Sequence, residues 1–325
     1  MLRSTAAQRL RGASRTVRLA QAASRAAVAL PSFSPSRTFA STSSFRIPPT
    51  SSPTNTISQE EIAFFSSLSA EWWNPKGEFG LLHRMNPARI QVLRDELLKE
   101  RELPAARWLE GKSVLDVGCG GGIFAESLAR LGANTLAIDA SGSNITVAQT
   151  HASLDPSLHV VNSPIPSSSS SSSASPPQNT LVYRHCAAED LVKEGKQFDV
   201  VCAVEVVEHV EDPQGFLDCL GELLKPGGVL LLSTISRTPL AKLLTITLAE
   251  DVLRLVSPGT HTYHKYIKPS ELVTFFEQDK GWKGVEVRGC PYDPIAGKWR
   301  LLQPGEPGGV GQLVNYFATV RKPLQ

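Results

Sequence analysis

The sequence predicts an α/β protein whose central sheet is mostly parallel, carries helices on both faces and ends in an antiparallel C-terminal strand. Two observations support this fold class. From residue 113 to about residue 234, short runs of branched apolar residues alternate with segments of helical spacing, which is the pattern of a parallel sheet covered on both sides. The run 198–204 is almost continuously apolar, as expected for a central strand buried on both faces.

Seven strands and their connecting helices follow in chain order. The predicted strands are 113–117, 134–138, 181–185, 198–204, 228–234, 283–289 and 313–321. The first helix is expected after Ser58, because Glu61 stands three residues later as in a capping box. Further helices are predicted at 90–101, 123–131, 214–224, 238–256 and 269–276.

The chain divides into a leader and one folded domain. Residues 1–46 are predicted to be a mitochondrial presequence, because they hold eight arginines and no lysine or acidic residue; a disordered basic tail is the alternative. Residues 47–57 are a predicted linker, and the folded domain spans 58–325. Within it, 162–180 is a Ser/Pro-rich insertion expected to be disordered, and 238–258 is an amphipathic helical insertion.

Composition excludes several classes of protein. The net charge is +2, but without the eight leader arginines 25 basic residues face 31 acidic ones, a net of −6, so nucleic-acid binding is not expected. Five cysteines without a C-x-x-C pair give no disulfide framework or zinc knuckle. No window of 18 uninterrupted apolar residues occurs, so no membrane-spanning helix is predicted.

A glycine-rich turn indicates a cofactor that carries adenosine. Four glycines within five positions, 118 to 122, connect the strand 113–117 to a helix, so the backbone can approach a ligand that also faces the first helical amides. Asp139 ends the second strand, where a carboxylate can bind a ribose; its alternative role is an N-cap for the helix from Ser141. Asp116 could hold an ammonium group. An NAD-dependent dehydrogenase stays open at this point.

Longer motifs identify a family. The glycine turn, Asp139 and the turn 224–228 (Leu-Lys-Pro-Gly-Gly) together resemble the class I, Rossmann-like methyltransferases that use S-adenosylmethionine. The flanking motifs resemble the ubiquinone-biosynthesis O-methyltransferases over residues 62–320. These motifs are Trp72-Trp73, Gly77-Glu78-Phe79, the segment 82–89 (Leu-His-Arg-Met-Asn-Pro-Ala-Arg), 205–210 (Glu-Val-Val-Glu-His-Val) and Gly259-Thr260-His261.

The resemblance implies an activity and a location. The family methylates a phenolic hydroxyl of 3,4-dihydroxy-5-polyprenylbenzoate and of demethylubiquinol. It works peripherally on the matrix side of the mitochondrial inner membrane, within a multi-subunit coenzyme Q biosynthesis complex. The resemblance also makes residues 58–325 an S-adenosylmethionine-dependent methyltransferase domain. A non-catalytic scaffold of the same complex is the remaining alternative.

The resemblance also assigns site residues. Arg89, Gly118, Asp139 and Val204 match the family's S-adenosylmethionine contacts, and we add Asp116 and Gly120 from the glycine turn itself. Glu205, Glu208 and His209 match its ligands for a divalent metal, described as magnesium. These three are also the predicted catalytic residues.

The spacing of the three proposed ligands allows chelation. Glu205, Glu208 and His209 stand at i, i+3 and i+4, which places them on one face of a helical turn. A metal there would lower the pKa of a phenol and position its oxygen. Magnesium prefers an all-oxygen shell, so the histidine leaves zinc and manganese open. Two alternatives are surface carboxylates with a packed histidine, and His209 as a metal-free general base.

Three further features have two readings each. Trp72 and Trp73 either form a pocket wall or lid, or brace the N-terminal helix on the domain. The apolar stripe of the helix 238–256 either packs in the core or contacts a membrane or the isoprenoid tail of the substrate. His261 and His264 could touch the substrate ring or be solvated in their loops; single loop histidines are usually solvated, so no role is predicted for them.

Overall fold

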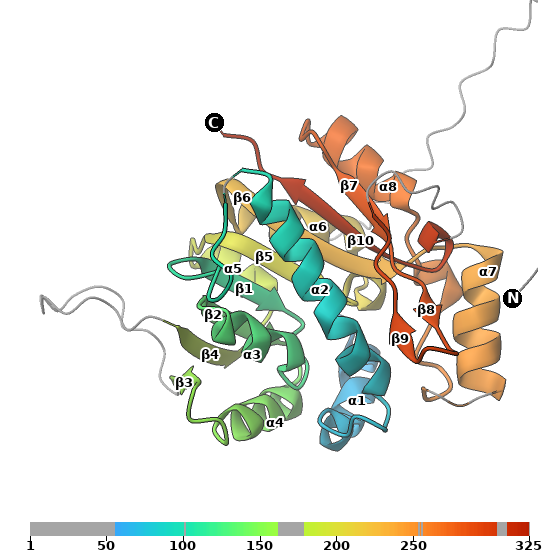
Figure 1. Ribbon diagram of the computed structural model, residues 1–325. Helices are drawn as coiled ribbons and strands as arrows, with labels where there is room; N and C mark the ends of the chain where they lie inside the picture. Colours follow the sequence, from blue (N-terminus) through green and yellow to red (C-terminus); the bar gives the residue numbers. More distant parts are fainter. Residues whose placement is uncertain are drawn as a thin grey trace, which may run out of the picture. The chain divides into compact units, whose positions relative to one another are not determined.

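The computed structural model describes residues 56–100, 102–161, 179–252, 254, 256–303 and 311–324 (Figure 1). The predicted presequence, the linker up to residue 55 and residues 162–178 of the serine-rich insertion lie outside these residues. So do Leu253 and Leu255 of the apolar stripe.

One mixed sheet of eight strands forms the centre of the domain, in the order β3-β4-β2-β1-β5-β6-β10-β7. The strands from β3 to β6 run parallel, and β10 is antiparallel to both β6 and β7. Their bounds are β1 Ser113–Val117, β2 Asn134–Asp139, β3 His159–Val160, β4 Thr180–His185, β5 Phe198–Val204, β6 Leu224–Ile235, β7 Glu286–Gly289 and β10 Asn315–Arg321. The predicted fold class is confirmed, and the two-residue edge strand β3 is added to the seven predicted strands.

Alternation along the central strands places apolar side chains on both faces of the sheet. In β5, Val201 and Ala203 pack in one core cluster, while Val200 and Cys202 pack in the cluster on the opposite face. Both faces of the sheet are therefore buried at β5, as the continuous apolar run predicted. The helices that contribute buried residues to the first cluster are α5 (Ala188–Lys193), α6 (Pro213–Glu222) and α8 (Pro269–Val273).

The opposite face is covered by α2 (Gly80–Leu98), α3 (Ile123–Arg130) and α4 (Gly142–Ala152). Figure 1 shows α2 crossing the sheet in front of β1 and β5. The helix α2 begins ten residues before the predicted start at residue 90 and contains Pro87 within it. Proline removes one helical hydrogen bond, and here the helix continues through it because Met85, Ala88 and Val92 are buried against the sheet.

The N-terminal helix α1 (Gln59–Ser67) begins where the sequence predicts. The Ser58 hydroxyl accepts the N–H of Glu61 at 3.5 Å, which is half of the predicted capping box. The Glu61 carboxylate does not complete the box, because it contacts His209 and Lys265 instead, each at 3.1 Å. The helix α1 buries no residue completely, so these polar contacts tie it to the domain.

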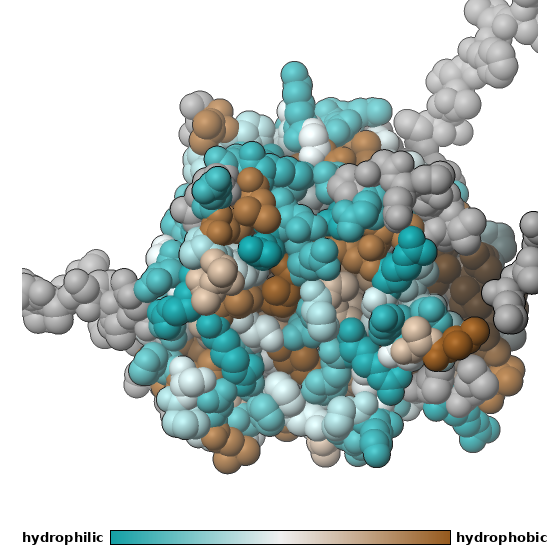
Figure 2. Space-filling view, in the orientation of Figure 1, coloured by the Kyte–Doolittle hydropathy of each residue, from teal (hydrophilic) through white to brown (hydrophobic). Residues whose placement is uncertain are grey.

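The insertion after β6 is helical, and its apolar stripe is only partly packed in the core, where Leu240, Ala241 and Ile246 join a buried cluster. The helix α7 (Pro239–Ala241) continues as a π-helix over Lys242–Val252. Four of its large apolar side chains are exposed: Leu243, Leu244, Leu248 and Val252. Figure 2 shows apolar surface at the right of the view, where Figure 1 places this helix and the hairpin of β8 (Tyr292–Asp293) and β9 (Lys298–Trp299).

The packed-core interpretation of the stripe is therefore wrong for these four residues. The lid or membrane-surface interpretation stays a prediction for them. Among the described residues, none of the helices is both long and apolar enough to cross a membrane.

Candidate active site

The glycine turn after β1 has a backbone that only glycine adopts without strain. Gly118, Gly120 and Gly122 have φ values of +68°, +53° and +89°, in the left-handed region that glycine favours. A Cβ on Gly120 would also lie 2.3 Å from the ring of Trp72. The turn is thus shaped both by its own conformation and by an aromatic ring packed against it.

The two adjacent tryptophans make different contacts. Trp72 is buried, donates its indole N–H to Asn144 of α4 at 2.9 Å and stacks on Phe79 at 3.7 Å. Trp73 donates to the carbonyl of Gly121 at 2.8 Å and stacks on His151 of α4. Because Trp72 also lines the cavities described below, it is a pocket wall, whereas Trp73 braces the N-terminal segment on the domain.

Asp139 fastens the glycine turn to the end of β2. Its carboxylate accepts the N–H groups of Gly120 and Ser141, both at 2.8 Å, and the amide of Asn144 at 3.3 Å. Burial raises the pKa of Asp139 above its ordinary value. The N-cap of α4 is Ser141, whose hydroxyl accepts from Asn144, so the alternative role of Asp139 as that cap is wrong.

Asp116 and Arg89 form a buried pair of opposite charges with free hydrogen-bonding atoms. Their side chains belong to residues only 1% and 3% exposed. Neither carboxylate oxygen of Asp116, nor Nε of Arg89, has a hydrogen-bond partner among the residues that the structure describes. Burial raises the pKa of Asp116 to about 7, and burial lowers that of Arg89.

Orphaned buried charges are costly unless a ligand satisfies them. The ammonium and carboxylate of an amino acid are the complementary pair, because the first donates to Asp116 and the second accepts from Arg89. The predicted role of Asp116 toward an ammonium group fits this geometry.

Two neighbouring cavities lie at the carboxyl ends of β1, β2 and β5. The larger has a volume of about 310 Å³ and is lined by Arg89, Asp116, Gly118 and Val204. The smaller, of about 150 Å³, is lined by Asp139, Gly118 and residues of the α1 segment. They share five lining residues: Phe65, Trp72, Gly118, Glu205 and His209.

The shared residues make the two cavities one elongated site. The end beside Asp139 adjoins the glycine turn, and the end beside Asp116 and Arg89 holds the two buried charges. Five of the six predicted cofactor residues therefore line the site. The sixth, Gly120, acts through its N–H bond to Asp139.

The three predicted metal ligands do not form the expected helical turn. Glu205 has a left-handed backbone, with φ of +56°, and only Val207–His209 wind, as a 3-10 turn. Glu205 accepts from the hydroxyl of Ser233 at 2.7 Å, and Glu208 from that of Thr234 at 2.9 Å.

His209 is turned to a different partner. Its Nδ1 contacts Glu61 of α1 at 3.1 Å. Within the described part of the chain, no three His, Cys, Asp or Glu side chains come together in a way that could hold a metal ion. The chelate expected from the i, i+3, i+4 spacing is thus not formed, because the strand-to-turn backbone sends the side chains to Ser233, Thr234 and Glu61.

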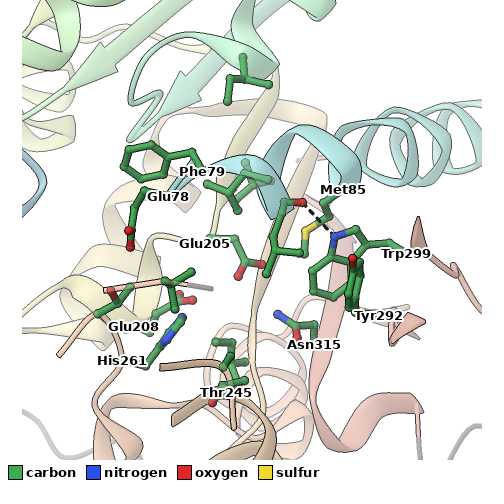
Figure 3. Close-up of a pocket in the computed structure, with 18 of the residues that line it drawn as sticks. Glu78, Phe79, Met85, Glu205, Glu208, Thr245, His261, Tyr292, Trp299 and Asn315 are labelled. Atoms are coloured by element: carbon green, nitrogen blue, oxygen red, sulfur yellow. Dashed lines mark hydrogen bonds between the residues drawn. The ribbon is translucent and has the colours of Figure 1, made fainter. Parts of the chain in front are cut away.

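Glu205 and Glu208 nevertheless face the larger cavity (Figure 3). Glu208 is 3% exposed. Burial first, and then the charge of Glu205, raise the pKa of Glu208 well above its ordinary value. Burial thus favours the neutral form of Glu208 more than in an exposed glutamate, and both carboxyl groups line the cavity.

Distant segments close the larger cavity, and the sequence alone did not connect them to the site. Glu78 accepts the N–H and hydroxyl of Ser257 at 2.5 and 2.9 Å, which ties the 77–79 motif to the segment just before the 259–261 motif. Trp299 of the β8–β9 hairpin donates to the Leu81 carbonyl at 2.9 Å, the dashed line in Figure 3. Tyr292, Asn315 and His261 also line the cavity; only His261 lies in a recognisable motif.

Comparisons with known proteins agree with this geometry. A family model described as a methyltransferase domain matches residues 62–287. The mitochondrial ubiquinone biosynthesis O-methyltransferase of Schizosaccharomyces pombe is 43% identical over 83% of this chain and 88% of its own. The ubiquinone biosynthesis O-methyltransferase of Cereibacter sphaeroides is 38% identical over 77% of this chain and 93% of its own. The chain belongs to the ubiquinone-biosynthesis O-methyltransferases.

Solved structures support the fold. An S-adenosylmethionine-dependent methyltransferase from Thermotoga maritima superposes with a TM-score of 0.52 at 15% identity, over 81% of this chain and 99% of that one. The magnesium protoporphyrin IX methyltransferase of Synechocystis, with S-adenosylhomocysteine bound, gives 0.50 at 16% identity, over 81% of this chain and 99% of that one. The family predicted from the motifs is confirmed, and a dehydrogenase of similar fold is excluded.

Proposed function

We propose that this O-methyltransferase moves the methyl group of S-adenosylmethionine to a phenolic hydroxyl of 3,4-dihydroxy-5-polyprenylbenzoate and of demethylubiquinol. The observation that carries the proposal is the buried Asp116–Arg89 pair, whose free atoms match the amino-acid end of the cofactor. Asp139 lines the other end of the same site, which supports a role toward the ribose. A non-catalytic scaffold would have no use for two buried charges whose hydrogen-bonding atoms lack partners among the described residues.

The chain's contribution to the reaction is positioning. S-adenosylmethionine supplies an activated methyl group on a sulfonium. The protein must hold the acceptor oxygen in line with it and keep water away. The larger cavity suits an aromatic acceptor, because Phe79, Met85 and Trp299 line it beside the polar pair Glu205 and Glu208. A catechol can hydrogen-bond to that pair through its two hydroxyls.

A divalent metal is implied by the family resemblance but does not fit the side chains as they lie. Glu205, Glu208 and His209 point to separate partners. The side chains as they lie support no metal-dependent step. Assistance by magnesium, zinc or manganese is tested with a chelator.

The proposed setting is the matrix side of the mitochondrial inner membrane, where the chain would act peripherally within a coenzyme Q biosynthesis complex. The arginine-rich leader and the mitochondrial yeast relative support the organelle. The exposed apolar side chains of the π-helix 242–252 support contact with the bilayer or with the polyprenyl tail. Leu244 and Leu248 are both partly exposed and part of the cavity lining, so a tail could leave the cavity along them.

The test uses the full chain, labelled S-adenosylmethionine and a catechol with a short prenyl tail. Label transfer to one catechol oxygen, absent without acceptor, is the expected result. Tight binding of S-adenosylmethionine without transfer to any catechol or quinol would contradict the enzyme proposal and favour the scaffold.

A further inference from the structure

A buried carboxylate holds a histidine at the edge of the active-site cavity. Glu250, on the π-helix, is 1% exposed. Its Oε1 lies 2.5 Å from Nδ1 of His261 and accepts the backbone N–H of His261 at 2.9 Å. Its Oε2 accepts the N–H of Gly259 at 2.8 Å. The carboxylate thus fixes the loop and the imidazole ring together.

This arrangement determines which ring nitrogen carries the hydrogen. The Glu250 oxygens already accept two backbone N–H groups, so the carboxylate faces Nδ1 as an acceptor, and the hydrogen of neutral His261 lies on Nδ1. Nε2 is then an acceptor with a free lone pair. No described residue hydrogen-bonds to it, and the ring lines the larger cavity (Figure 3).

The groups around the His261 ring also bear on its role. Tyr266 packs edge-on against His261 at 6.1 Å, and burial raises the pKa of Tyr266, so it remains a neutral neighbour. The other ionisable groups that line the larger cavity are Glu78, Arg89, Asp116, Cys119, Glu205, Glu208, His209 and Tyr292. Glu78 bonds Ser257 and Glu205 bonds Ser233. His209 also turns its Nδ1 to a carboxylate, but that carboxylate, Glu61, is shared with Lys265, whereas Glu250 is buried and holds both His261 and its loop.

We propose that His261 is the catalytic base of the methyl transfer and that Glu250 is its positioning residue. The proposal rests on the phenol methylation of the preceding subsection. A phenol has a pKa near 10, so under about 1% is ionised at pH 7 to 8, and a base is needed at the acceptor oxygen. A histidine aligned by a carboxylate supplies one.

The step balances without a further reagent. The phenolic O–H gives its proton to Nε2 while the oxygen forms the bond to the methyl carbon. The carbon–sulfur bond breaks, and its electron pair stays on sulfur as a neutral thioether. The products are an aryl methyl ether, S-adenosylhomocysteine and an imidazolium whose charge faces Glu250.

The experiment compares acceptors of different acidity. In the full chain, His261→Asn and Glu250→Gln are assayed with a plain catechol and with a nitrocatechol whose hydroxyl is ionised at the assay pH. With the plain catechol, His261→Asn should lower kcat roughly 100-fold, a typical contribution of general base catalysis. Glu250→Gln should lower it less. With the nitrocatechol both losses should shrink to a few-fold, because that nucleophile needs no base.

The matched control is His264→Asn, because His264 is exposed and three residues from His261. It should match the wild type with both acceptors. Added imidazole should partly restore His261→Ala toward the plain catechol. Thermal unfolding and S-adenosylmethionine binding by calorimetry identify any variant that fails to fold, and His261→Gln then replaces it.

Two outcomes would overturn the assignment. An equal loss of activity with both acceptors would mean that His261 shapes the cavity and takes no proton. An unchanged kcat in folded His261→Asn would exclude any role. If the wild type methylates neither acceptor, the proposed function itself fails, and that result is visible before any variant is compared.

Discussion

Replacing Asp116 by asparagine should change cofactor affinity and protein stability in opposite directions. The carboxylate is buried, faces the charge of Arg89, has no hydrogen-bond partner among the described residues and lines the cavity. In the complex it would meet the ammonium of the cofactor, and a charged hydrogen bond contributes about 1.5–3 kcal/mol. Asp116→Asn should therefore weaken S-adenosylmethionine binding roughly 10- to 100-fold.

Without ligand, the buried Asp116 carboxylate lowers the stability of the folded protein. Burial raises its pKa from the ordinary 3.8 to about 7, so the folded state binds a proton more tightly than the unfolded state. The folded protein then loses stability as pH rises from about 4 to 7, and the full loss persists above 7. A shift of that size corresponds to about 4 kcal/mol, an upper bound on what Asp116→Asn recovers at pH 8.

Calorimetric titration at pH 8 measures the first effect, and urea unfolding of the ligand-free chain at pH 5 and pH 8 measures the second. The control is Asp279→Asn, an exposed aspartate at the end of α8's π-helical extension, which should alter neither. Wild-type affinity in Asp116→Asn would refute the ammonium site. A loss of stability at pH 8 would show that the carboxylate has a protein partner instead.

Three other predictions concern the turn, the apolar helix and the metal. Gly120→Ala should cost about 1–3 kcal/mol of unfolding free energy and weaken cofactor binding, because Trp72 and a φ of +53° both oppose a Cβ. The control is Gly195→Ala, at a position with φ of +65° and no atom within 4 Å of the added Cβ, which should cost only about 1 kcal/mol. Equal losses of unfolding free energy in the two variants would contradict a role for Trp72. Leu243→Glu with Val252→Glu should reduce co-sedimentation with cardiolipin-containing liposomes, while the equally exposed Leu154→Glu should not; unchanged sedimentation of the pair would rule out this surface. Removing metal with a chelator should leave methylation of a nitrocatechol intact. If magnesium restores lost activity in the wild type but not in Glu205→Gln, a metal binds after the side chains rearrange.

The strands were predictable because each has a local cause. In β5, alternate side chains serve two different clusters and all are apolar, so composition alone reports burial on both faces. The start of α1 was predictable for the same reason, since Ser58 caps the N–H of Glu61 three residues away. The cofactor residues Asp116, Gly118 and Asp139 follow from the place of strand ends in a parallel sheet, which is also a local property of the sequence.

The predicted arrangement of the three metal ligands is not found, because the backbone departs from a regular helix at Glu205. Spacing of i, i+3 and i+4 means a shared face only if every residue between has helical angles. Glu205 has a left-handed backbone because it leaves β5 with its N–H and carboxylate both bonded to Ser233 of β6. Ser233 is 28 residues from Glu205 in the sequence, so no local pattern predicts the contact. A positive φ at a non-glycine residue beside a cavity is strain that surrounding contacts maintain.

Long-range contacts also explain why the sequence points to His209 as a candidate catalytic residue and not to His261. His209 stands directly in a cluster of acidic residues, and that is a strong local signal. Yet Glu61 of α1, which contacts Nδ1 of His209, also binds Lys265, whereas the carboxylate that contacts Nδ1 of His261 is buried. His261 looks like an isolated loop histidine, and its partner Glu250 comes from the preceding π-helix. Since the value of a histidine depends on which nitrogen its neighbour holds, a base can be recognised only when the folded chain brings that carboxylate to it.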